Sequence, residues 1–379
     1  MNVWKNTRRN IGLIETPLVI SATSAEPSYS AFTNVDQYLR ACPVHNITPM
    51  HTNKPFADKM GISQVFFKDE STRHGLGSFK ALGGAFAVAQ TLLNRARAKS
   101  DKVLDFQSLT TPALKKQASA ITFVCASAGN HGISVASGAQ RFGAKSLIFL
   151  SQQVPHAFAN KLKMLGASII KAGNTYEESL HAAKAASVLN NHILLPDAAT
   201  EAQLEMPRLV MEGYLTVAIE TMDTIAKQPT HIFLQGGVGG FAAAMAAAFR
   251  HCYGYKPKLV IVEPSKAPCL LESTKAGKPT KAGSEVSNMG RLDCKETSLS
   301  ALSLLAREAD YFVTISDKLA LEACALLADN KLPTSPSGAA GFAAAFALCQ
   351  NSDTRLALEI NQHSRVLLFL TEGQVDEKC

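Results

Sequence analysis

The sequence predicts an α/β protein built from two open, twisted parallel sheets with a cleft between them. Short apolar runs alternate with helical patterns along most of the chain, which is typical of buried strands joined by crossover helices. The runs fall into two consecutive groups, so we expect two sheets. The chain has 379 residues, of which 46% are hydrophobic and 18% charged, and it can therefore bury cores of this size.

The first group of predicted strands lies in the middle of the chain. These strands are ITFVCAS (121–127), KSLIFLS (145–151), SIIKAG (168–173) and HILLPD (192–197). Helical segments such as residues 175–191 separate them. We assign residues 101–189 to a smaller α/β domain and interpret the polar stretch 95–120 as an insertion.

The second group predicts the larger sheet. Its strands are THIFLQ (230–235), KLVIVEP (258–264), YFVTIS (311–316) and RVLLFLT (365–371). A helical pattern over residues 207–227 precedes them, with Pro207 expected at the first helical position. We assign residues 1–100 and 190–379 to this larger, cofactor-binding domain.

Composition excludes several classes of partner. The net charge of +7 is spread without a run of Lys and Arg, and aromatics are only 7%, so a nucleic-acid surface is not indicated. No apolar window is long enough for a membrane span, and the N-terminus lacks a continuous apolar leader, so we expect a cytoplasmic protein. The eight cysteines are scattered without metal-ligand spacing, which predicts reduced thiols and no metal site.

A glycine-rich loop, QGGVGGFA at residues 235–242, lies between a predicted strand and a helical run. Glycines let the backbone turn tightly, and the N-terminus of the next helix favours an anion. The loop is therefore a candidate phosphate cradle. Gly237, Gly239 and Ala242 also satisfy the dinucleotide fingerprint, with Glu263 where an acid would bind a ribose hydroxyl. A nucleotide, another phosphate and a structural turn all stay open here.

Two further motifs point to the ligand. SAGNHG (127–132) follows a predicted strand, where Asn130 and His131 would meet a substrate, although Asn130 alone also suits a turn. Lys80 stands in GLGSFKALGGAF, an apolar stretch with glycines. Burial lowers the pKa of an amine, and a neutral amine can form a Schiff base with an aldehyde. A phosphate cradle and a buried lysine together indicate pyridoxal 5'-phosphate.

Four motifs taken together carry a family resemblance. They are KDESTRHGLGSFKALGGAFA (68–87), SAGNHG, the glycine loop and LTEG (370–373). They resemble the fold type II pyridoxal-phosphate lyases, which have the fold of tryptophan synthase beta. The lysine motif is similar to that of the diaminopropionate ammonia-lyases, within the threonine and serine dehydratase superfamily. Further agreements are LPDAATEA around Asp197, VEP (262–264), MGRLDCKETS from Met289 and TSPSGAAG from Thr334.

The resemblance implies a role for each matching residue. Lys80 would hold the cofactor covalently, Phe79 would pack beside its ring, and Asn130 would bond its phenolic oxygen. The phosphate would bind Gly236, Gly237, Val238, Gly239 and Gly240. Thr371 would face the pyridine nitrogen with a neutral hydroxyl, which suits elimination, unless it is only a strand-end threonine. The substrate would contact Ser127, Ala128 and His131.

The chain also departs from the family pattern. The family has an aspartate immediately before GNHG that serves the D-substrate, and Ala128 stands at that position. Asp197 matches the second family acid, which serves the L-substrate, although it also suits a helix cap before AATEA. Gly77, His74 and the run CKET replace the usual asparagine, phenylalanine and CGEP, so we expect a changed substrate pocket.

The resemblance implies α,β-elimination of ammonia from 2,3-diaminopropionate, with Lys80 and Asp197 as the catalytic residues and a preference for the L-isomer. The products would be pyruvate and ammonia. An L-threonine, serine or hydroxyaspartate dehydratase stays open, because the sequence around Asn130 looks more like the dehydratases. A catalytically inactive cofactor-binding protein and a nicotinamide dehydrogenase also stay open. The family habit implies a homodimer whose partner is a small amino acid, with no nucleic acid or membrane.

Overall fold

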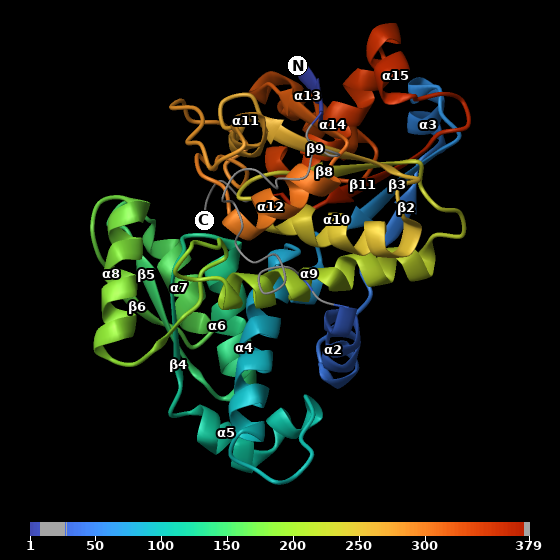
Figure 1. Cartoon of the computed structure of the whole chain (residues 1–379). Coiled ribbons are helices and arrows are strands. Elements are labelled where there is room, and N and C mark those ends of the chain that lie inside the picture. Colours follow the sequence, from blue (N-terminus) through green and yellow to red (C-terminus); the bar gives the residue numbers. More distant parts are fainter. Residues whose placement is uncertain (8–26, 28, 375–379) are drawn as a thin grey trace.

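The computed structural model describes residues 1–7, 27 and 29–374. In chain order its strands are β1 (Asn2–Lys5), β2 (Met50–Thr52), β3 (Gln64–Asp69), β4 (Thr122–Ala126), β5 (Lys145–Leu150), β6 (Ser168–Lys171), β7 (Ile193–Leu194), β8 (His231–Gln235), β9 (Lys258–Pro264), β10 (Tyr311–Ile315) and β11 (Arg365–Leu370). They form a seven-stranded sheet of order β1-β10-β9-β8-β11-β3-β2 and a four-stranded sheet of order β6-β5-β4-β7 (Figure 1).

Both sheets have the predicted parallel character. Among the described strands, only β1 and β2, at the two edges of the larger sheet, pair antiparallel with their neighbours. All eight predicted strands are confirmed, whereas β1, β2 and β3 were not predicted. Strand β7 belongs to the smaller sheet although it follows residue 189, where we placed the end of the smaller domain.

The helices connect these strands and cover the sheets. They are α2 (Tyr29–Ala41), α3 (Lys54–Met60), α4 (Lys80–Arg97), α5 (Pro112–Ala118), α6 (Asn130–Phe142), α7 (His156–Met164), α8 (Tyr176–Leu189), α9 (Glu205–Thr224), α10 (Gly240–Tyr253), α11 (Cys269–Ala276), α12 (Leu299–Glu308), α13 (Asp317–Asp329), α14 (Pro336–Cys349) and α15 (Ser352–Leu358). Short 3-10 turns lie at η2 (Arg73–Gly75) and η3 (Gln107–Thr110). Helix α9 begins at Glu205, so the prediction that Pro207 opens it is wrong by two positions.

Alternate side chains of the larger sheet enter two different cores. On β8, Ile232 and Leu234 share a core with α9, α10 and α12, whereas Phe233 packs with α3, α13 and α14 on the other face. This alternation follows from the two-residue period of a strand. The larger sheet is therefore covered by helices on both sides, as a parallel sheet requires.

We call the four-stranded sheet with α6, α7 and α8 the smaller lobe, and the seven-stranded sheet with the helices that cover it the larger lobe. Helix α4 joins the two lobes, because it packs against both α6 of the smaller lobe and α9 (Figure 1). Glycines allow the close approach at each crossing. A Cβ on Gly138 of α6 would lie 2.6 Å from the Cα of Ala85, and a Cβ on Gly213 of α9 would lie 2.9 Å from the Cα of Gly83. The glycines after Lys80 therefore serve helix packing, and one continuous core runs from one lobe to the other.

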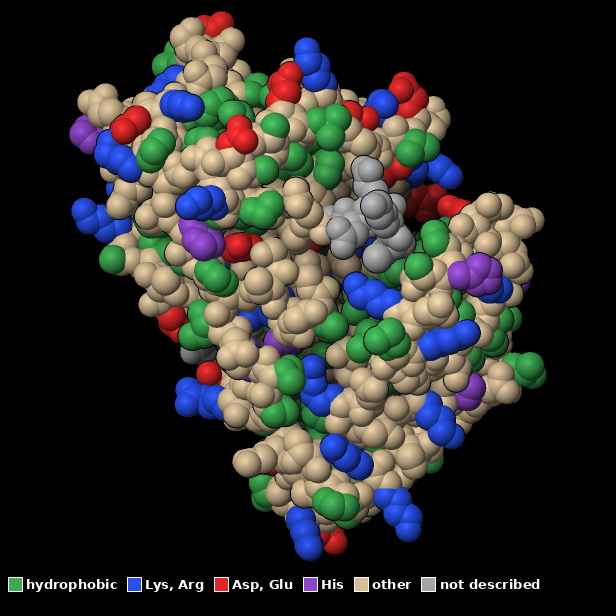
Figure 2. Space-filling model, turned by 180° about the vertical axis from the view of Figure 1, so that it is seen from behind, with side chains coloured by type: hydrophobic (Ala, Val, Ile, Leu, Met, Phe, Trp, Pro, Cys, Tyr) green, Lys and Arg blue, Asp and Glu red, His purple; other side chains and the backbone are tan. Residues whose placement is uncertain are grey.

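The surface charge and the length and apolarity of the helices can be compared with the predictions about nucleic acid and membranes. Figure 2 shows acidic and basic side chains intermixed on the upper part of the face opposite to that of Figure 1, whereas the lower part carries basic side chains with few acidic ones. Among the helices of the described residues, none has the length and apolarity needed to cross a membrane. Most of the N-terminal stretch from which we inferred the absence of a leader lies outside the described residues.

Candidate active site

The predicted site residues come together at the carboxyl ends of strands from both sheets. Strand β8 leads into the glycine loop, β4 into residues 127–130, and β11 into residues 371–373. Strand β7 leads towards Asp197. The edge formed by such strand ends is where ligands bind in open α/β sheets.

The backbone around Lys80 is clamped by the segment that follows β11. The Phe79 N–H donates to the Thr371 carbonyl at 3.1 Å, and the Gly373 N–H donates to the Gly77 carbonyl at 3.1 Å. Between them, Ser78 forms an antiparallel bridge with Glu372. These bonds explain why the lysine motif and LTEG, which lie far apart in the sequence, form one site.

Lys80, at the start of α4, is paired with Asp197, which follows β7 of the smaller sheet. The Lys80 Nζ donates to Asp197 Oδ2 at 2.7 Å, and the two side chains are 24% and 21% exposed. Burial opposes the positive charge, but Asp197, with Tyr214 and Cys294, holds the pKa of Lys80 above its ordinary value. The predicted lowering of this pKa is therefore wrong, because the sequence did not show that a carboxylate faces the amine.

Asp197 is an ionised carboxylate in this arrangement. Burial would raise its pKa, but Lys80 and His131 lower it well below the ordinary value. The alternative interpretation as a helix cap is wrong, since no helix begins until Glu205. His131 is buried and its Nε2 bonds the Leu195 carbonyl at 2.9 Å, so it holds the chain that leads to Asp197.

The glycine loop has the geometry of a phosphate cradle. Gly239 has φ +101°, and a Cβ there would lie 2.8 Å from the Cβ of Ala301. Helix α10 begins at Gly240, so its first N–H groups have no acceptor inside the helix. A partly exposed amine at Lys80 and free N–H groups at the loop fit a cofactor that carries both an aldehyde and a phosphate.

The competing dinucleotide interpretation requires a free acid at Glu263, and the structure contradicts it. Glu263 is fully buried, and its two carboxylate oxygens accept the N–H groups of Leu270 and Leu271 at 2.8 and 2.9 Å. The carboxylate therefore caps α11 and is not available to a ribose hydroxyl.

The remaining predicted residues lie at the same strand ends. Asn130 Nδ2 donates to Glu372 Oε2 at 2.7 Å, and Ser127 Oγ accepts the N–H groups of Gly129 and Gly132 at 3.3 and 3.1 Å. Ala128 is exposed and Thr371 is buried. Their contacts with cofactor or substrate stay predictions.

The comparisons with known proteins agree with this geometry. The family model for pyridoxal-phosphate dependent enzymes matches residues 42–372. The chain belongs to the pyridoxal-phosphate dependent enzymes. It is 29% identical over 348 residues to the diaminopropionate ammonia-lyase of Salmonella typhimurium, covering 87% of this chain and 86% of that protein. It is also 26% identical over 305 residues to the human L-serine dehydratase/L-threonine deaminase, covering 79% and 83% of the two chains.

A solved structure is similar over the whole chain. The diaminopropionate ammonia-lyase of Escherichia coli, in complex with an aminoacrylate-PLP azomethine reaction intermediate, superposes with a TM-score of 0.85 at 26% identity. The match covers 100% of this chain and 94% of that chain. The predicted fold type and pyridoxal phosphate as the cofactor are thus confirmed for this pyridoxal-phosphate dependent enzyme.

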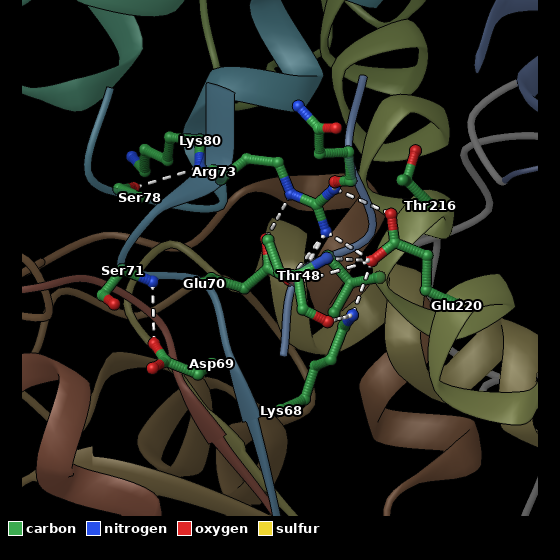
Figure 3. Close-up of polar contacts among 12 residues, drawn as sticks. Thr48, Lys68, Asp69, Glu70, Ser71, Arg73, Ser78, Lys80, Thr216 and Glu220 are labelled. Carbon is green, nitrogen blue, oxygen red and sulfur yellow. Dashed lines mark hydrogen bonds and ion pairs between the residues drawn. The ribbon is translucent and has the colours of Figure 1, made fainter. Parts of the chain in front are cut away.

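A buried ion network lies directly before the lysine loop of this pyridoxal-phosphate dependent enzyme (Figure 3). The Arg73 guanidinium makes two bidentate pairs, with Glu70 at 2.8 and 2.8 Å and with Glu220 of α9 at 2.7 and 2.7 Å. Lys68 Nζ donates to Glu220 at 2.5 Å, and Thr48 Oγ1 donates to Glu70 at 2.6 Å. The network ties β3, η2 and α9 together behind Lys80.

Sequence reasoning missed three residues that shape the site. Tyr214 is buried, its ring lies 4.9 Å from that of Phe79 between centroids, and its charge interaction with Lys80 affects the pKa of the amine. Cys294 approaches the glycine loop, and burial raises its pKa to about 11. Glu372 receives the bond from Asn130. Cys294 and Glu372 stand in motifs that we quoted, whereas nothing in the sequence pattern singles out Tyr214.

The aromatic contacts of Phe79 place it beside the site. Its ring centroid lies 4.5 Å from that of Phe241 as well as near Tyr214. Its packing beside the cofactor ring stays a prediction. Among the described residues, no three His, Cys, Asp or Glu side chains cluster in a way that could hold a metal ion.

Proposed function

We propose that this enzyme removes ammonia from 2,3-diaminopropionate and releases pyruvate and ammonia, with a preference for the L-isomer. The observation that carries the proposal is the pair of Lys80 and Asp197, 2.7 Å apart at the strand ends beside the phosphate cradle. The 29% identity to diaminopropionate ammonia-lyase over 87% of the chain supports this choice of substrate.

Pyridoxal phosphate supplies an aldehyde that combines with amines and a conjugated ring that withdraws electrons from the substrate α-carbon. The residues present would hold it through Lys80 Nζ and through the loop of Gly236, Gly237, Val238, Gly239 and Gly240. Asn130 is proposed to bond its phenolic oxygen, and Thr371 is proposed to face its pyridine nitrogen. These roles rest on the motif positions and on the convergence of the three segments at the same strand ends.

Asp197 is proposed to accept the proton that leaves the substrate α-carbon. While Lys80 is an ammonium, it depresses the pKa of Asp197, whereas burial acts in the opposite direction. When the amine of Lys80 is neutral, burial dominates and the carboxylate becomes a stronger base. The two groups are therefore coupled, and Lys80 Nζ is the alternative proton acceptor at the same position.

The proposed L-preference rests on Ala128. Each enantiomer presents its α-hydrogen to one face of the site, and a positioned base contributes roughly 100-fold to 10,000-fold to proton transfer. Asp197 supplies a carboxylate on one side, whereas the methyl group of Ala128 cannot accept a proton. We therefore propose that the L-isomer reacts much faster than the D-isomer.

A second candidate is a dehydratase of small hydroxyamino acids. It is supported by the 26% identity to the human L-serine dehydratase/L-threonine deaminase over 79% of this chain. In that case Lys80 rather than Asp197 would take the proton. That the enzyme works as a homodimer in the cytoplasm remains a proposal based on the family.

A substrate panel separates these candidates. Pyruvate release should be fastest from L-diaminopropionate, compared with D-diaminopropionate, L-serine and D-serine, with oxobutyrate measured for L-threonine. Lys80→Ala should abolish turnover together with the visible absorbance that borohydride bleaches. Faster release from L-serine or L-threonine would favour the dehydratase, and no release from any compound would favour a catalytically inactive protein.

A further inference from the structure

Arg291 lies on the long coil between α11 and α12, and its backbone is firmly held beside the site. Its N–H donates to Ser337 Oγ at 3.0 Å, and the neighbouring Met289 is fully buried. Its carbonyl oxygen would lie 3.2 Å from a Cβ on Gly237 of the glycine loop. Three residues later, Cys294 comes close enough to Lys80 to affect the pKa of the amine. The backbone of Arg291 therefore lies against the glycine loop.

The guanidinium of Arg291 extends from the larger lobe to the substrate loop of the smaller lobe. Its Nη1 would lie 3.2 Å from a Cβ on Gly129, so this glycine leaves room for the cation. On its other side, Arg291 Nε lies 3.8 Å from Glu372 Oε2. The guanidinium thus stands between the segments that carry Asn130 and Glu372.

The guanidinium of Arg291 forms a long ion pair with Glu372 but donates no hydrogen bond within the part of the chain that the structure describes. An arginine carries five N–H donors, and none of the hydrogen bonds among the described residues has the Arg291 side chain as its donor. Glu372 is already bound by Ser335 Oγ at 2.5 Å and Asn130 Nδ2 at 2.7 Å. The Arg291 side chain is 39% exposed, so a solute can reach it.

We propose that Arg291 binds the α-carboxylate of the amino-acid substrate and thereby determines which compounds the site accepts. A planar guanidinium suits a carboxylate because two parallel N–H bonds can form. The assignment rests on the proposed function only in taking the substrate to be an α-amino acid. The cation would repel the β-ammonium of diaminopropionate, so it also orients the substrate with its carboxylate towards Gly129 and its β-carbon away.

The test compares a substrate with its uncharged analogue in the loaded enzyme. Arg291→Gln should raise KM for L-diaminopropionate about 10- to 100-fold, the range expected for a hydrogen-bonded charge pair. It should change KM for the α-amide of diaminopropionate by less than about 3-fold. Arg291→Lys should raise KM for L-diaminopropionate less than Arg291→Gln does, because the lysine keeps the positive charge. Lys281→Gln is the matched control, because Lys281 is an exposed cation of the same coil that is 71% exposed.

Other results would overturn the assignment. An equal rise in KM for the acid and the amide, or no rise, would show that the guanidinium does not bind the carboxylate. Loss of the visible absorbance of the cofactor in Arg291→Gln would assign the residue to cofactor binding instead.

A separate measurement keeps this test independent of the leaving group. L-alanine has no group to eliminate, and its binding can be followed by the change that it causes in the cofactor absorbance. Arg291→Gln should weaken the binding of L-alanine about 10- to 100-fold more than it weakens the binding of L-alaninamide. If the wild type releases no pyruvate from diaminopropionate but binds L-alanine in this way, the proposed function fails and the role of Arg291 stands. If the wild type does not bind L-alanine, the role of Arg291 fails as well.

Discussion

The buried network around Arg73 makes a quantitative prediction about stability. The side chains of Arg73, Lys68 and Glu70 are fully buried, and that of Glu220 is 4% exposed. Two cations balance two carboxylates, and Arg73 makes bidentate pairs with both acids. Arg73→Met would leave Glu70 bonded to Thr48 but without its ion-pair partner. Removing one partner of a buried pair costs about 3–5 kcal/mol, because the other charge stays buried.

The loss should appear as a lower free energy of unfolding in urea, measured by circular dichroism on the enzyme loaded with cofactor. Arg40→Met is the matched control, since Arg40 is 78% exposed and pairs with Asp36 at 2.8 Å on the surface. That change should cost less than about 1 kcal/mol. If Arg73→Met lowered the unfolding free energy no more than Arg40→Met, the buried network would not be holding the segment before Lys80.

Three further predictions concern the glycine loop, the preference between L- and D-substrates, and the loss of stability at low pH. Gly239→Asp should weaken the binding of pyridoxal phosphate more than Gly239→Ala does, as measured by an absorbance titration, because both introduce a Cβ but only the aspartate opposes the phosphate charge. Equal affinities of the two variants, or binding of NADH by the wild type, would contradict the assignment of the glycine loop to this phosphate. Ala128→Asp should raise kcat/KM for D-diaminopropionate, and Asp197→Asn should remove most of the L-activity; similar wild-type kcat/KM values for both isomers would mean that the base is misplaced. Burial lowers the pKa of His74 to about 3, with Arg141, Arg73 and His45 acting in the same direction, so the stability that His74 contributes is present above about pH 6.5 and is lost as the pH falls towards 3. His74→Asn, which suits the φ of 51° at this position, should therefore reduce the loss of unfolding free energy between pH 7 and 4.5 by about 2–3 kcal/mol, and an unchanged pH profile would show that His74 is not the group that titrates.

The sequence predicted the strands with long apolar runs and missed the others for identifiable reasons. Strands β1 and β2 have four and three residues, too few to show a period. Strand β3 contains Lys68, which is fully buried because Glu220, 152 residues away, neutralises it. A lysine at such a position looks exposed in the sequence, since the partner that permits its burial lies on another element.

The candidate site shows the same division between local and distant information. The glycine loop and SAGNHG were found because each is a local motif that directly follows a strand. The direction of the shift in the Lys80 pKa was not predicted correctly, because it depends on Asp197, which is 117 residues away in the sequence. The capping role of Glu263 required the fold as well, since its carboxylate caps α11 through bonds that only the folded chain reveals.

The clamp between the lysine loop and residues 371–373 has a consequence for the biosynthesis of the enzyme. A ribosome makes Lys80 early, whereas Thr371 and Gly373, which hold the backbone on either side of Ser78, emerge among the last of the described residues. A nascent chain therefore carries the reactive lysine without these hydrogen-bond partners until residues 371–373 have left the ribosome. Binding of the cofactor at a fully formed lysine loop must wait for these residues, and a premature stop before residue 371 would leave the loop without their bonds.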